Sequence, residues 1–137
     1  MIAGLSIETQ GLGCYDITDR VAALLPSGDG LLTLFLRHTS CSLLIQENAD
    51  PSVQRDLLAW LDRIAPAADA PGMGWITHRS EGPDDMPAHL KAAVLPTSLN
   101  IPFVKGRMVL GTWQGIYLVE HRSRPHLRHI TLHMRPD

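Results

Sequence analysis

Glycine and proline recur along the whole chain and limit the length of any regular element. The 137 residues include 11 glycines and 10 prolines. Because both residues interrupt helices and strands, their spread excludes a long coiled coil and predicts many short elements. Hydrophobic residues make up 45% and charged residues 19%, which is enough apolar material for one core. At about 100–200 residues per domain, the length predicts a single domain over residues 1–137.

Apolar periodicity predicts the order strands, helix, strands, helix, strands. Leu32, Leu34 and Leu36 recur every second residue in a buried strand, with His38 on the same face. The clearest helix starts at Asp50, a good N-cap residue, followed by Pro51. The predicted helices cover 16–25, 51–64 and 87–95, and the predicted strands cover 2–10, 31–38, 41–46, 75–78, 97–103, 107–113, 115–121 and 128–134. This order favours an α+β fold, an antiparallel β-sandwich with two or three helices.

Several classes of protein are disfavoured by what the sequence lacks. The net charge is −2 and no long basic stripe is present, which argues against nucleic-acid binding. No run of 18 apolar residues is present, so no membrane span is expected. The N-terminus does not resemble a secretory signal, and we therefore expect a cytoplasmic protein in which Cys14 and Cys41 are reduced thiols. The common nucleotide-binding motifs are absent.

The segment from His78 to His89 is the best candidate for a metal site. The two histidines flank an acidic turn that contains Asp84 and Asp85 and leads into a helix. Imidazoles with one carboxylate or a third histidine suit Zn²⁺, whereas the carboxylates alone suit Mg²⁺. The alternative is a solvated acidic loop in which Asp84 or Asp85 caps the helix.

Polar residues near other strand ends form further candidates. His38 ends an apolar strand two residues before Ser40, although the pair lacks a third group for a nucleophilic triad. Glu47 lies in a loop before the best helix. Glu120 shares a strand face with apolar residues and therefore needs a partner, which the nearby Arg122 and Arg128 offer. These arginines could also hold a phosphate.

Four motifs in the same order resemble the YjbQ family, often labelled secondary thiamine-phosphate synthase. They are Arg37-His38-Thr39-Ser40, the run from Gln46 to Pro51, the run from Glu81 to His89, and the run from Gly111 to Arg122. The resemblance covers residues 5–134. It implies a compact α+β sandwich that assembles as a homotrimer, with sites near the subunit contacts. It also implies a weak transferase activity that joins a hydroxymethylpyrimidine diphosphate to a thiazole phosphate and releases pyrophosphate.

The residues and the resemblance together lead to one hypothesis and one rival. In the hypothesis, a small phosphorylated metabolite binds beside a divalent Zn or Mg ion, and stabilisation of the departing pyrophosphate drives the reaction. The candidate metal ligands are His78, His89, Asp84 and Asp85, and His38 is a third ligand or an acid/base group. The candidate catalytic residues are His38, Glu47, Glu120 and Arg122. The candidate phosphate-binding residues are Ser40, Arg122 and Arg128. In the rival, the protein is a trimeric metal- or phosphometabolite-binding protein without significant catalysis.

Overall fold

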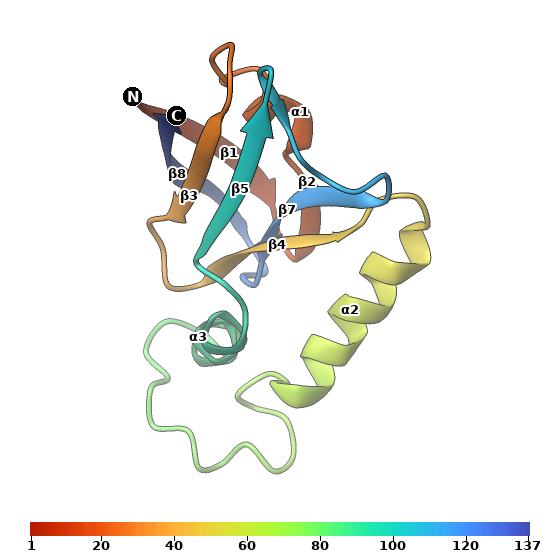
Figure 1. The fold of residues 1–137 in the computed structure, drawn as a ribbon. Helices are drawn as coiled ribbons and strands as arrows, with labels where there is room; N and C mark the ends of the chain where they lie inside the picture. Colours follow the sequence, from red (N-terminus) through yellow and green to blue (C-terminus); the bar gives the residue numbers. More distant parts are fainter.

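Two antiparallel sheets and three helices make up the fold, in a computed structural model that describes residues 1–137 (Figure 1). The five-stranded sheet has the order β1 (Ile2–Gln10), β8 (Pro125–Pro136), β3 (Gly30–Leu36), β5 (Ser98–Val104) and β6 (Arg107–Met108). The three-stranded sheet has the order β2 (Gly13–Asp16), β7 (Gln114–Glu120) and β4 (Cys41–Glu47). The helices are α1 (Thr18–Ala22), α2 (Pro51–Ile64) and α3 (Asp85–Val94). The α+β sandwich expected from the sequence is confirmed.

The main core lies between the two sheets and follows the predicted alternation. Leu32 and Leu34 of β3 and Leu132 of β8 point inward and are completely buried. They share one apolar cluster with Leu43 of β4 and Leu118 of β7 from the opposite sheet. Because successive side chains of a strand alternate between faces, the intervening residues of β3 and β8 face outward.

Helix α2 covers the outer face of the three-stranded sheet, so β7 is buried on both sides (Figure 1). Leu61 of α2 packs against Tyr117 and Val119 of β7. The helix begins as predicted, because Asp50 Oδ1 accepts a hydrogen bond of 2.9 Å from Ser52 N and Pro51 occupies the first turn. The helix is too short and too polar to cross a membrane, as are the other two.

The long connection between α2 and α3 differs from the sequence prediction. Residues 75–78 form no strand, so that prediction is wrong. The segment is instead fixed by Arg79, whose guanidinium donates to the carbonyls of Ala68, Met73 and Ile76 at 2.9–3.1 Å. The hydrogen bonds from one arginine therefore replace the backbone pairing of a strand, and they position the adjacent His78.

The remaining differences concern short elements at the sheet ends. Strand β2 was not predicted, because only four residues pair with β7. The predicted strand 107–113 is limited to Arg107–Met108, whereas β8 extends beyond its prediction at both ends. The predicted helix 16–25 is limited to Thr18–Ala22.

The two cysteines are free, as expected. Cys41 is completely buried in the main core, and this burial raises the pKa of its thiol to about 12. The protonated thiol acts there as a small apolar side chain.

Candidate metal centre

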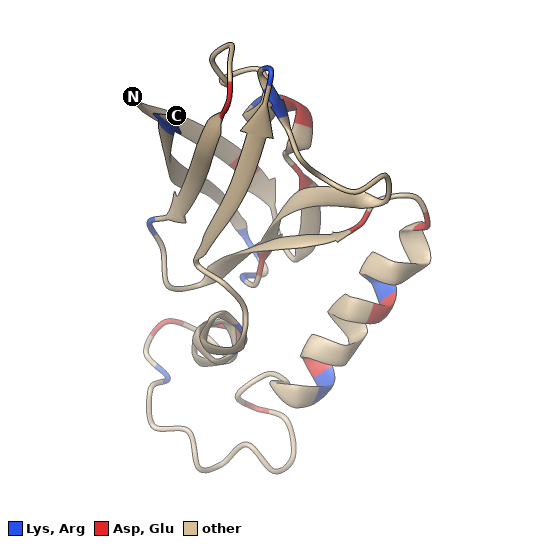
Figure 2. Cartoon of the chain, viewed as in Figure 1, with Lys and Arg blue, Asp and Glu red and all other residues tan.

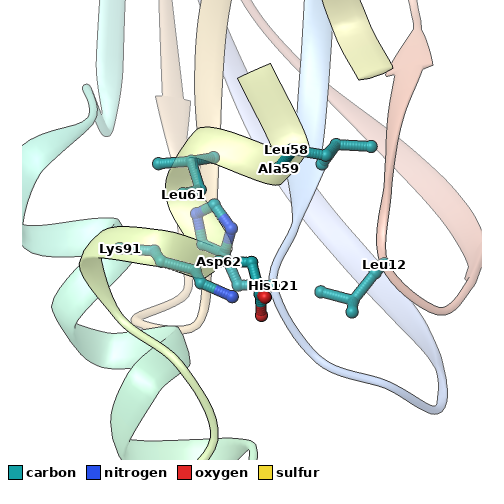
Figure 3. A pocket seen from close by; sticks show the side chains of 7 residues that line it. All are labelled: Leu12, Leu58, Ala59, Leu61, Asp62, Lys91 and His121. Atoms are coloured by element: carbon teal, nitrogen blue, oxygen red, sulfur yellow. The ribbon is translucent and has the colours of Figure 1, made fainter. Parts of the chain in front are cut away.

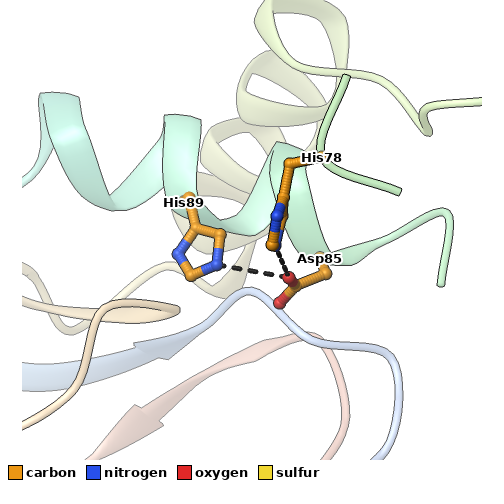
Figure 4. A group of neighbouring side chains, drawn as sticks. All are labelled: His78, Asp85 and His89. Atoms are coloured by element: carbon orange, nitrogen blue, oxygen red, sulfur yellow. Dashed lines mark hydrogen bonds and ion pairs between the residues drawn. The ribbon is translucent and has the colours of Figure 1, made fainter. Parts of the chain in front are cut away.

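Three side chains from the start of α3 and the preceding loop converge on one point (Figure 4). Asp85 is the first residue of α3, and His89 follows four residues later. Residues four apart lie on the same face of a helix, so both side chains point to the same side. His78 reaches this point from the loop that Arg79 fixes. The sequence prediction that His78 and His89 come together is confirmed.

The geometry is close enough for one ion to contact all three residues. His78 Nε2 lies 2.8 Å and His89 Nε2 lies 3.3 Å from Asp85 Oδ2. One ligand atom from each residue lies within 4.8 Å of the others. The Asp85 side chain is only 6% exposed, whereas 48% of His78 is exposed. The cluster therefore has a buried carboxylate and a side open to solvent.

The protonation of His89 favours a cation between the side chains. Its Nδ1 lies 2.8 Å from the carbonyl oxygen of Thr39, which only accepts hydrogen bonds, so Nδ1 carries a proton. In the neutral ring, Nε2 then presents a lone pair toward the carboxylate of Asp85. Two electron pairs at this distance repel each other unless His89 is doubly protonated or a cation lies between them. This arrangement is typical of metal-binding histidines, whose other nitrogen donates to a carbonyl or carboxylate.

Arg122 holds the far side of the cluster. Its Nη1 lies 3.0 Å from Asp85 Oδ1 and its Nε donates to Asp84 Oδ2 at 2.9 Å. The backbone N–H of Ser123 also donates to Asp84 Oδ2, at 2.9 Å. The expectation that the Asp84 side chain caps α3 is wrong, because its carboxylate makes no cap hydrogen bond. That carboxylate pairs with Arg122 and lies outside the His78–Asp85–His89 cluster.

These contacts keep Asp85 ionised. Burial raises the pKa of Asp85, but other contacts lower it further, below its ordinary value. They are the hydrogen bond from His78, the charge of His89 when its ring is protonated, and the charge of Arg122. Burial is likewise outweighed at Asp84, where bonds from Arg122 and Ser123 hold the pKa well below its usual range. Both groups are carboxylates at neutral pH, the form that binds a metal ion.

A second polar network lies in the core beside the first. Glu120 is completely buried and accepts hydrogen bonds from Thr9 Oγ1 at 2.6 Å and from Arg128 Nε at 2.7 Å. Arg128 also donates from Nη2 to Glu120, and to Ser40 Oγ at 3.0 Å. The backbone N–H of Arg122 donates to Glu120, which joins the two networks. We assign Glu120, Arg128 and Ser40 a structural role, because their polar atoms already bind one another.

Two other candidates lie elsewhere. Glu47 pairs with Gln114 at the opposite end of β7 from Glu120, about 20 Å away at 3.3 Å per strand residue. Its carboxylate accepts from the backbone N–H groups of Ala49 and Asp50 in the turn before α2. His38 stacks on His129 and its Nε2 accepts from His129 N at 2.8 Å. The third member of the cluster is therefore Asp85, and the structure does not bring His38 into it. The role of His38 as a ligand or an acid/base group stays a prediction.

Three residues that shape this region were not among the predicted site residues. Thr9 of β1 bonds Glu120 from a position far away in sequence, and Arg79 fixes the loop through backbone carbonyls. Neither pattern has a sequence signal, because their partners come together only in the folded chain. Lys91 was also overlooked, although an apolar helix position occupied by lysine is an unusual choice.

The fold and the site together define a two-sheet α+β protein with a candidate His–Asp–His metal centre at the first turn of α3. The family model described as UPF0047 protein YjbQ-like matches residues 4–137, and the chain belongs to this family.

Individual relatives support the same conclusion. A UPF0047 protein of Synechocystis is 45% identical over 133 residues, which cover 95% of this chain and 88% of that protein. The YjbQ protein of Salmonella typhimurium is 47% identical over 107 residues, covering 78% and 74% of the two chains. The crystal structure of a conserved hypothetical protein from Thermus thermophilus has a TM-score of 0.86 at 35% identity, covering 97% of this chain and 99% of that one. The family resemblance predicted from the motifs is confirmed.

Proposed function

We propose that this protein binds a divalent transition-metal ion through His78, Asp85 and His89 and uses it to hold a phosphate group of a small metabolite. The observation that carries the proposal is the tautomer of His89. Its Nδ1 proton is committed to Thr39 O, and its Nε2 faces the carboxylate of Asp85. A bound cation removes the conflict between the two electron pairs while the ring stays neutral, which is the form in which histidine binds a metal.

The donor set indicates which metal is expected. Two imidazoles and one carboxylate are a ligand set found in catalytic zinc sites, where a fourth position stays open to water or substrate. Mg²⁺ prefers oxygen ligands throughout. Since Asp84 is paired with Arg122, the cluster offers one carboxylate rather than two. The site therefore favours Zn²⁺ or a similar first-row ion over Mg²⁺.

The surrounding residues would prepare the three ligands. Arg122 orients Asp85, the Thr39 carbonyl orients His89, and Arg79 fixes the loop that carries His78. A bound ion supplies positive charge to phosphate oxygens, which is what a departing pyrophosphate requires. In its finer form, the proposal is the reaction implied by the resemblance. The pyrimidine unit, attached through its exocyclic CH2 group, passes from its diphosphate to a thiazole phosphate, and pyrophosphate leaves.

One observation favours a second candidate, a binding protein without significant catalysis. Glu47 and Glu120, the carboxylates expected to take part in catalysis, both serve as acceptors for other groups of the fold. The transferase and the binding protein can be distinguished by measuring pyrophosphate release when the protein is mixed with the pyrimidine diphosphate and the thiazole phosphate. Release that needs the metal and His78 supports the transferase, and tight binding of the phosphorylated ligands without release supports the binding protein.

The metal content of the purified protein tests the shared part of both candidates. We expect near-stoichiometric zinc or another first-row metal by elemental analysis of tag-free protein, and loss of this metal in the His78→Ala, His89→Ala double variant. His133→Ala is the matched control, because His133 is an exposed histidine on the outer face of β8. Wild type that takes up no metal after incubation with Zn²⁺ or Mn²⁺, or a double variant that retains it, would contradict the proposal.

The homotrimer implied by the resemblance stays a prediction. We expect light scattering to give three times the mass of one chain. The outer face of the five-stranded sheet exposes Leu31, Phe35 and Leu127, and burial of these side chains would stabilise such an assembly. A mass equal to one chain would contradict the prediction.

A further inference from the structure

A cavity lies between α2, α3, the turn between β1 and β2, and the residue that follows β7 (Figure 3). Its volume is about 240 Å³, and an adjoining cavity of about 270 Å³ shares Leu12, Asp62, Lys91 and His121 with it. Lys91 comes two residues after His89 in α3. At 3.6 residues per turn, these two side chains leave the helix on nearly opposite sides. The cavity is therefore separate from the His78–Asp85–His89 cluster.

Lys91 is the unusual residue of this cavity. The residue is only 7% exposed, and its ammonium group makes no hydrogen bond or ion pair with the protein, so its nitrogen is accessible only from the cavity side. Lysine is almost never buried this far without a direct partner. Burial lowers the pKa of Lys91, and the more distant charges of Asp62 and Asp84 raise it only in part. Figure 3 shows its ammonium end pointing into the cavity that His121 and Asp62 also line. A ligand in the cavity would supply the missing partner.

The other ionisable groups around the cavity define the charge of that ligand. Burial and the charge of Lys91 lower the pKa of His121 to about 4, so this imidazole is neutral at pH 7. Its Nε2 lies 2.8 Å from Ser42 Oγ. Asp84 is neutralised by Arg122 at 2.9 Å. Asp62 is exposed at the rim and makes no ion pair with Lys91. One unpaired cation inside and one carboxylate at the rim favour a monoanion over a dianion.

The remaining walls define the body of the ligand. Leu12, Leu58 and Leu61 line the cavity together with Ala59. An apolar cavity of about 150 Å³ is enough to hold benzene. The volume of about 240 Å³ therefore accommodates an aromatic ring or a branched alkyl group with one carboxylate.

We propose that this cavity binds a small monocarboxylate with an apolar body, with the carboxylate on Lys91 Nζ and the body against Leu12, Leu58 and Leu61. The site is independent of the metal centre, because it uses the opposite side of α3. The carboxylate replaces the water that contacts the ammonium in the open cavity, and the apolar body leaves water as it binds.

Calorimetric titration with benzoate tests the proposal, with benzamide as the neutral analogue and phenyl phosphate as the dianionic one. We expect wild type to bind benzoate more tightly than either analogue, and Lys91→Met to weaken benzoate binding by roughly tenfold or more. Methionine keeps the length of the apolar stem. Lys105→Met is the matched control, because Lys105 is the only other lysine and is exposed. The His78→Ala, His89→Ala variant is expected to bind benzoate as wild type does.

A second measurement uses only wild-type protein, so it does not depend on the folding of any variant. Benzoate is expected to slow acetylation of Lys91 by an activated ester while leaving Lys105 unchanged, as measured by mass spectrometry of the digested protein. Equal protection of both lysines, no protection of Lys91, unchanged affinity in Lys91→Met, or tighter binding of benzamide or phenyl phosphate would overturn the proposal.

Discussion

Replacing Glu120 with leucine is expected to lower the free energy of unfolding by about 3–5 kcal/mol, the usual cost of removing one partner from a buried ion pair. Glu120 is fully buried and Arg128 is 4% exposed. Without the carboxylate, the guanidinium of Arg128 keeps only its bonds to Ser40. Urea unfolding monitored by circular dichroism measures the loss.

Glu8→Leu is the matched control for this substitution. Glu8 lies on β1 and is exposed, so its replacement is expected to change stability by no more than about 0.5 kcal/mol. The double variant Glu120→Leu, Arg128→Leu is expected to be more stable than Glu120→Leu alone, because it leaves no unpaired charge. A Glu120→Leu protein as stable as wild type would show that the buried pair contributes nothing.

The same pair makes stability depend on pH in a defined direction. Burial raises the pKa of Glu120, but the hydrogen bonds from Arg128, Thr9 and the backbone of Arg122 lower it further, below its ordinary value. A carboxyl whose pKa is depressed by folding stabilises the protein above its unfolded pKa, about 4.3 for glutamate, and this contribution is lost as the pH falls toward the folded pKa. We expect Glu120→Leu to lose less stability in acid than wild type does.

Replacing Arg122 with methionine is expected to have a second large effect, again a loss of about 3–5 kcal/mol. Its guanidinium lies 2.9 Å from Asp84 Oδ2 and 3.0 Å from Asp85 Oδ1, and its side chain is 9% exposed. Removal leaves two carboxylates side by side in a poorly solvated position. Thermal or urea unfolding at low salt measures the effect.

Two controls separate this effect from a general loss of charge. Arg124→Met removes a neighbouring arginine that is exposed, and it is expected to leave stability nearly unchanged. If the metal proposal holds, Zn²⁺ raises the stability of Arg122→Met and of wild type, but not of the His78→Ala, His89→Ala variant. Equal stability of Arg122→Met and wild type would contradict the role assigned to Arg122.

Local signals predicted much of the fold. Helix α2 begins and ends where the Asp50 cap, the apolar stripe and Pro66 place it. The inward residues of β3 and β8 also follow the two-residue period. Strand β2 was not predictable in this way, since four residues acquire strand geometry only through pairing with β7. The loop held by Arg79 depends on three carbonyls that no sequence pattern reveals.

The candidate site was predicted in part for a similar reason. His78, Asp85 and His89 lie close together in sequence, and the turn before α3 brings them together. Asp84 and Asp85 are neighbours with the same chemistry. Only the folded structure shows that Asp84 forms an ion pair with Arg122, whereas Asp85 contacts the histidines. Glu47 was predicted to take part in catalysis and not in the capping turn, yet its carboxylate accepts from the backbone N–H groups of that turn.

The end of β7 has a consequence for how this chain tolerates change in length. Glu120 points into the core network, His121 lines the cavity and Arg122 holds the metal cluster, so three neighbouring residues serve three separate environments. A strand that slips by one residue turns every side chain to the other face. Insertion or deletion of a single residue in β7 before Glu120 would therefore disrupt the core network, the cavity and the metal cluster together. The connection between α2 and α3 would tolerate such a change at positions away from Arg79.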